Sequence, residues 1–107
     1  MRTIKHNEAI GIVRRLKRTL EAEGVPVQRV FLFGSLANGK SHEWSDIDVA
    51  VVHEPFLDTT GKEKSHLFER GKSCDVRIEL LSFRPDDFMN RYSSLAQEVH
   101  THGVEVE

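Results

Sequence analysis

Hydrophobic residues in the first half of the chain repeat first at helical and then at strand spacing. Over residues 7–23 apolar side chains recur every three or four positions, with basic residues between them and Gly24 after them, which predicts an amphipathic helix. Residues 27–33 form a β-branched and aromatic run that predicts a buried strand. Residues 46–53 alternate apolar with acidic positions and then continue as an apolar run, which predicts a second strand.

A third alternating segment follows in the second half of the chain. Residues 74–83 predict a strand that includes Cys74 and carries carboxylates on one face. One side of this segment presents Val76, Ile78 and Leu80, and the other presents Asp75, Arg77 and Glu79.

The remaining segments are polar or short. Residues 55–72 are polar and predict a mobile connection with a short helix over residues 63–70. Helix-start residues at 85–87, a helical segment at 94–102 and a final edge strand at 104–107 complete the chain. This order of elements predicts an α/β or α+β fold, in which helices flank a small mixed β-sheet.

Composition limits size, charge and compartment. A length of 107 residues, 38% of them hydrophobic, predicts a single domain over residues 1–107 with a modest core. Fifteen basic against seventeen acidic residues give a net charge of −2, so we expect no bulk nucleic-acid binding. One cysteine and no long apolar segment predict a cytoplasmic protein without a disulfide or a membrane span, and we expect the six histidines at the surface.

Candidate chemistry is concentrated between the first two strands. Gly34 and Ser35 follow the first strand, and Asp46 and Asp48 open the second. Residues i and i+2 of a strand share a face, so the two carboxylates lie side by side and repel each other unless a cation neutralises them. Carboxylate oxygens suit Mg²⁺, which also binds phosphates, and the glycine turn can hold phosphate oxygens on backbone N–H groups. The pattern predicts a site for Mg²⁺ and a nucleoside triphosphate.

Two other interpretations compete with this one. A single Asp-x-Asp is more often a turn cap followed by a solvated strand residue, but here it coincides with the glycine turn and a third acidic strand. Residues 34–41 also match the P-loop pattern G-x-x-x-x-G-K-[ST]. A P-loop opens into a helix, and residues 42–45 are too few for a helix before the next strand.

At these residues the sequence resembles the minimal nucleotidyltransferases of the DNA polymerase β-like nucleotidyltransferase superfamily. Gly34-Ser35, ten further residues and Asp46-Ile47-Asp48 reproduce the family pattern GS-x10-DxD. The resemblance implies the polymerase β-like fold, two Mg²⁺ ions on Asp46 and Asp48, and phosphate binding at the glycine turn. Many relatives read GS-x-A-R-G, whereas this chain has Asn38 where the arginine falls. The nucleotide-binding residues expected from the resemblance are Gly34, Ser35, Lys40 and Ser45, with Lys40 as the replacement cation.

The third carboxylate of the family site has two candidates in this chain. Asp75 and Glu79 lie four apart on the expected third strand. The Arg-Ile-acid pattern and the distance to Pro85 favour Glu79 as the residue that binds a metal or accepts the proton of the attacking hydroxyl. Asp75 remains the alternative.

The resemblance implies an enzyme that uses ATP or another nucleoside triphosphate to transfer NMP, most simply AMP, to an acceptor hydroxyl. Short chains of this family often pair with a helical HEPN protein as a toxin–antitoxin module, in which the transferase adds AMP to the toxin. We therefore expect a HEPN-type partner, and self-association stays open. The alternative function is a non-catalytic binding subunit with the same fold.

Overall fold

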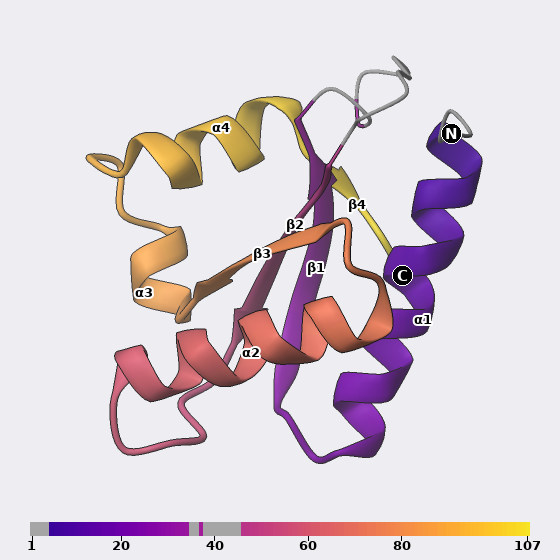
Figure 1. Ribbon diagram of the computed structural model, residues 1–107. Helices are drawn as coiled ribbons and strands as arrows, with labels where there is room; N and C mark the ends of the chain where they lie inside the picture. The colour runs from indigo at the N-terminus through magenta and orange to yellow at the C-terminus, as the bar shows by residue number, and fades with distance from the viewer. Residues whose placement is uncertain (1–4, 35–36, 38–45) are drawn as a thin grey trace.

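The computed structural model describes residues 5–34, 37 and 46–107, and its centre is a four-stranded mixed sheet (Figure 1). The strands are β1 (Val27–Phe33), β2 (Ile47–His53), β3 (Ile78–Phe83) and β4 (Val104–Glu105), in the spatial order β3-β2-β1-β4. The pairs β1–β2 and β1–β4 are antiparallel, whereas β2–β3 is parallel. The predicted α/β class with a small mixed sheet is confirmed.

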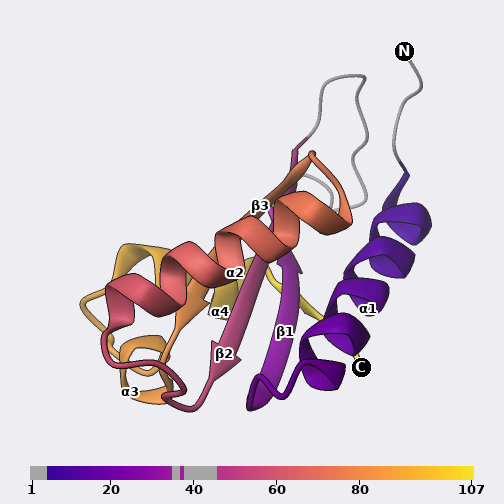
Figure 2. The same ribbon diagram turned by 60° about the horizontal axis from the view of Figure 1, so that its bottom comes forward.

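Among the described residues, four helices cover the two faces of this sheet. One face packs against α1 (His6–Ala22) and α2 (Thr60–Cys74), and the other packs against α3 (Pro85–Phe88) and α4 (Ser94–His102) (Figures 1 and 2). The side chains of each strand contribute alternately to the two layers, because successive side chains point to opposite faces. In β2, Ile47, Val49 and Val51 join the core under α1 and α2, and Ala50 and Val52 join the core under α3 and α4.

Helix α1 forms where the apolar spacing predicts it. Its buried residues fall at helical spacing on the side that faces the sheet: Ala9, Ile12, Val13, Leu16 and Leu20. Gly24 follows the helix with φ +87°, a left-handed conformation that glycine adopts without strain. The predicted boundaries, residues 7–23, differ from the observed ones by a single residue at each end.

The segment expected to be a mobile connection is a regular helix instead. Helix α2 runs over Thr60–Cys74, and Thr59 caps it by accepting a hydrogen bond from the Lys62 N–H at 3.1 Å. Its buried residues are Glu63, Leu67 and Gly71, so the inward face contains one large apolar side chain. A Cβ at Gly71 would lie 2.9 Å from Ile78 Cγ2, which shows how closely α2 approaches β3. The predicted helix over residues 63–70 is confirmed but was too short, and the expectation of a mobile connection was wrong for the rest of α2, because a glycine and a carboxylate occupy positions where a periodicity search expects apolar residues.

The third strand begins later than expected. Cys74 ends α2, residues 75–77 form the connection, and β3 starts at Ile78. The Ile47 N–H donates to the Arg77 carbonyl at 2.9 Å, which fixes the start of β2 beside the start of β3. The prediction of one strand over residues 74–83 was therefore wrong for its first four positions. The short helices at 85–88 and 94–102 are confirmed, and the final edge strand is limited to β4.

Within the described residues, no helix has both the length and the apolar content needed to cross a membrane.

Candidate functional site

Two carboxylates lie on neighbouring strands at one end of the sheet. The parallel register of β2 and β3 pairs Asp48 with Glu79, and the antiparallel register of β1 and β2 pairs Asp48 with Phe33. Asp48 shares its side of β2 with Ala50, which is buried in the core under α3 and α4. Asp48 and Glu79 therefore lie on this face, where β1 ends and β2 and β3 begin.

The electrostatic environment of Asp48 disfavours its charged form. Burial raises the pKa of Asp48 above its usual value, and the neighbouring carboxylates of Asp46 and Glu79 raise it further. Asp48 is half-buried, whereas Asp46 is exposed just before β2 begins. The site thus concentrates negative charge that a cation would neutralise.

The donor set has the chemistry that Mg²⁺ prefers. Carboxylate oxygens from two adjacent strands are hard ligands, and the pKa of Asp48 is raised by burial and then by neighbouring negative charge, which a divalent cation would neutralise. Across residues 5–34, 37 and 46–107, however, no three His, Cys, Asp or Glu side chains already stand close enough together to hold a metal ion. The residues fit the cation in chemistry.

Gly34 brings the backbone at the end of β1 against Asp48. It has φ +76°, and a Cβ placed on it would overlap Asp48 Oδ2 and lie 3.2 Å from Asp48 Cγ. Only glycine satisfies both the left-handed backbone and the close approach. The glycine turn and the second aspartate singled out in the sequence are therefore in direct contact. Ser35, Lys40 and Ser45, the other expected nucleotide-binding residues, lie outside the described residues.

Glu79 is held by a lysine that the sequence did not indicate. Lys72, in the last turn of α2, donates to Glu79 Oε1 at 2.9 Å and to the Val76 carbonyl at 3.0 Å. Its ammonium also lies 5.3 Å from the centre of the Phe68 ring. The pair joins the end of α2 to the start of β3, and its members are seven positions apart in the sequence.

Asp75 makes contacts of a different kind. It accepts hydrogen bonds from the Arg77 N–H and Nε at 2.9 Å each and from Arg77 Nη2 at 2.7 Å. The hydrogen bonds from Arg77 lower the pKa of Asp75, although its partial burial opposes this. Asp75 caps the end of α2 instead of occupying β3, so the structure brings Glu79, and not Asp75, beside Asp48.

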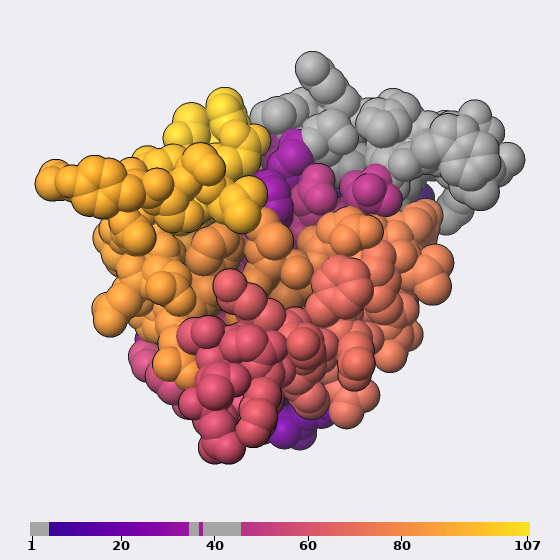
Figure 3. Space-filling model, turned by 60° about the vertical axis from the view of Figure 1, so that its left-hand side comes forward, coloured from indigo at the N-terminus to yellow at the C-terminus, as the bar shows by residue number. Residues whose placement is uncertain are grey.

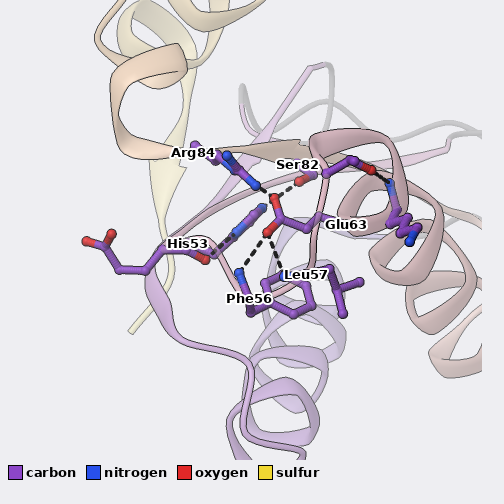
Figure 4. A network of polar contacts seen from close by, with 9 residues as sticks. His53, Phe56, Leu57, Glu63, Ser82 and Arg84 are labelled. Carbon is purple, nitrogen blue, oxygen red and sulfur yellow. Dashed lines mark hydrogen bonds and ion pairs between the residues drawn. The ribbon is translucent and has the colours of Figure 1, made fainter.

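A buried polar network at the opposite end of β2 and β3 contains a histidine expected at the surface (Figure 4). His53 is fully buried, and its Nε2 lies 2.6 Å from Ser82 Oγ. Beside it, Glu63 is 1% exposed and accepts from Arg84 Nε at 2.9 Å. The expectation that all histidines are exposed was wrong for His53, because its apolar strand neighbours carry it into the core.

A cavity of about 710 Å³ runs along β3, between α2 on one side and α3 and α4 on the other (Figure 3). Leu81 and Ser82 of β3 form part of its floor, and Phe68 and Leu95 lie on opposite sides of it. Phe68 is 41% exposed and Leu95 is 53% exposed, so apolar surface is accessible there. The hollow lies along the strand that contains Glu79, but Glu79 and Asp48 are not among the residues that line it.

The sequence of this site matches a known family. The model of the nucleotidyltransferase domain family matches residues 13–98, which contain the glycine turn, both aspartates and Glu79. The chain belongs to this family. The resemblance drawn from the GS-x10-DxD pattern is confirmed.

Individual members of the family are similar in sequence and in structure. A probable protein adenylyltransferase MntA from Haemophilus influenzae is 32% identical over 79 residues, which are 72% of this chain and 64% of that protein. A crystal structure of a toxin–antitoxin with AMP-PNP contains a chain that is 25% identical, with a TM-score of 0.61 over 88% of this chain and 72% of that one. A nucleotidyltransferase structure from Sulfolobus solfataricus shares the fold at 13% identity, with a TM-score of 0.67 over 94% of this chain and 80% of that one.

Proposed function

We propose that the chain is a Mg²⁺-dependent, cytoplasmic nucleotidyltransferase that transfers AMP from ATP to a hydroxyl of a partner protein. The observation that supports this most directly is the register of Asp48 with Glu79, with Gly34 packed against Asp48. The 32% identical relative is named as a probable protein adenylyltransferase, and the structure solved with AMP-PNP is 25% identical. Nucleotide and acceptor therefore both have precedent among similar proteins.

Each residue of the site has a separate task in this mechanism. Asp46 and Asp48 would hold the metal ions, Glu79 would complete the set from β3, and Gly34 lets the backbone turn toward the phosphates. Bound Mg²⁺ would neutralise charge on the phosphates during in-line displacement at the α-phosphorus. The acceptor oxygen bonds to the α-phosphorus as the bond to pyrophosphate breaks, and Glu79 would accept the proton of the attacking hydroxyl. Most of the rate enhancement comes from position and charge, as in other phosphoryl transfers.

The acceptor is a HEPN-type toxin, and the chain acts as its antitoxin. The similar structure solved with AMP-PNP is a toxin–antitoxin complex. A bare sheet face cannot hold an acceptor hydroxyl at attack distance, so the partner must dock over the carboxylates. A net charge of −2 favours a protein acceptor over nucleic acid.

Transfer of label tests the proposal. The chain is incubated with Mg²⁺ and α-³²P-ATP, alone, with RNA, and with a HEPN-type protein. We expect labelled HEPN protein, no labelled RNA, and no transfer by Asp48→Asn. The non-catalytic alternative predicts a stable complex without label. Labelling of RNA alone would contradict the protein acceptor and leave nucleotidyl transfer standing.

The P-loop alternative does not fit the topology. A P-loop connects its strand through a helix to a parallel strand, whereas β1 pairs antiparallel with β2. Lys40 and Ser41, the residues that would define the motif, lie outside the described residues.

A further inference from the structure

Lys72 approaches Glu79 from the opposite layer of the molecule. Helix α2 packs on the face of the sheet that contains Ile78 and Leu80, and the side chain of Glu79 alternates with these two residues. The lysine must therefore reach around β3, which is the outermost strand of the sheet on this side. The tight contact of Gly71 with Ile78 fixes the last turn of α2 where this reach is possible.

The contacts of Lys72 define what it can do. Its ammonium has three N–H donors, of which one is used by Glu79 Oε1 and one by the Val76 carbonyl. One Glu79 oxygen is thus bound by a cation that belongs to the protein. The side chains of Lys72 and Glu79 are 31% and 43% exposed, so water screens the pair and another cation can displace it.

We propose that Lys72 is a positioning residue. Its ammonium binds the Glu79 carboxylate in the metal-free protein and is displaced from it when a divalent cation binds. This proposal rests on the proposed function, because it assigns Glu79 to the metal site. The ammonium of Lys72 and the divalent cation compete for the carboxylate of Glu79. A positive charge beside a ligand opposes the approach of a second positive charge, so Lys72 weakens metal binding while it keeps the empty site from accumulating negative charge.

Binding of Mn²⁺ alone, followed by the electron paramagnetic resonance signal of the free ion, tests the proposal without any measurement of transfer. We expect Lys72→Met to bind Mn²⁺ about three- to fivefold more tightly than the wild type, and Lys72→Arg to bind like the wild type. In the Glu79→Gln background, Lys72→Met should have no effect beyond about twofold, because the lysine acts through Glu79. Lys62→Met is the matched control, since Lys62 lies on the same helix and pairs with Asp58 instead.

A second measurement uses the unaltered protein. The side-chain ammonium resonance of Lys72, protected by its two acceptors, should shift or disappear when Mg²⁺ is added, while that of Lys62 does not change. Equal or weaker Mn²⁺ binding by Lys72→Met, or an unperturbed Lys72 resonance in saturating Mg²⁺, would overturn the proposal. If Glu79→Gln binds Mn²⁺ as the wild type does, Glu79 is not a ligand and the assignment of the site itself fails. If Glu79→Gln weakens binding and Lys72→Met does not strengthen it, only the role of Lys72 is refuted.

Discussion

The backbone of Gly34, just after β1, packs directly against the carboxylate of Asp48 in β2. Gly34→Ala would force a methyl group into Asp48 Oδ2 at a residue whose φ is +76°. We expect this variant to lose roughly 1–3 kcal/mol of stability and most of its transfer activity. Thermal unfolding and label transfer measure the two effects.

Gly61→Ala is the control for this substitution. A Cβ at Gly61 meets only Thr59 Oγ1, at 3.9 Å, and the residue lies in the first turn of α2. We expect Gly61→Ala to be neutral or slightly stabilising, because alanine favours helix. Equal effects of the two substitutions would contradict the contact between Gly34 and Asp48.

Asp48→Asn should separate activity from stability. The raised pKa of Asp48 means that the folded protein binds a proton more tightly there than the unfolded chain does, so ionisation costs stability as the pH rises above the usual range of an aspartate. The variant should lose transfer and yet unfold at the same or a higher temperature at neutral pH. Melting curves of the two proteins should converge as the pH is lowered and the wild-type carboxyl becomes protonated. A variant that is less stable at neutral pH and equal at acid pH would show that the carboxylate is stabilising.

Much of this arrangement could be predicted from the sequence because it depends on short-range rules. The glycine after the first strand and the Asp-x-Asp pattern predict where β1 ends and β2 begins, and strand parity places Asp48 on the face of Ala50, whereas Asp46 lies just before β2. The family pattern spans the same residues, so two independent arguments agree on this part of the site.

The remainder depends on contacts that the sequence does not display. Helix α2 was predicted only over residues 63–70, because Gly71 and Glu63 occupy inward positions, and both are favourable only against particular partners, Ile78 and Arg84. Once α2 extends to Cys74, the strand after it must begin at Ile78, and Asp75 leaves the face of Glu79. Lys72 could have been noticed as the cation nearest in sequence to Glu79, but only the corner between α2 and β3 brings the two together.

Substitution of Asp75 and of Glu79 should give opposite results. Asp75→Asn weakens three hydrogen bonds to Arg77, and we expect a lower melting temperature with transfer retained per folded molecule. Glu79→Gln keeps the shape of the side chain, loses its pair with Lys72, and should abolish transfer with little change in stability, because the pair is only part-buried and water screens it. Thermal melting measures the stability of each variant, and label transfer per folded molecule measures its activity. If Asp75→Asn were the inactive variant, the third carboxylate would be Asp75.

Protonation of the buried Glu63 carboxylate, which pairs with Arg84, should lower the free energy of unfolding in acid. Burial alone would raise the pKa of Glu63, but the hydrogen bond from Arg84 and those from the N–H groups of Leu57 and Phe56 outweigh it and lower the pKa to about 2. A carboxyl with a lowered pKa stabilises the fold above its ordinary value, 4.5 in the unfolded chain, and this contribution disappears as the pH falls toward 2. We therefore expect Glu63→Gln to lose roughly 3 kcal/mol at neutral pH, because Arg84 is left without its charged partner. The loss should shrink steadily in urea unfolding curves taken down to about pH 3.

Asp58→Asn, which removes an exposed pair with Lys62, should show little change at any pH. A loss for Glu63→Gln that is the same at every pH would mean that its packing, and not its charge, stabilises α2 against β3.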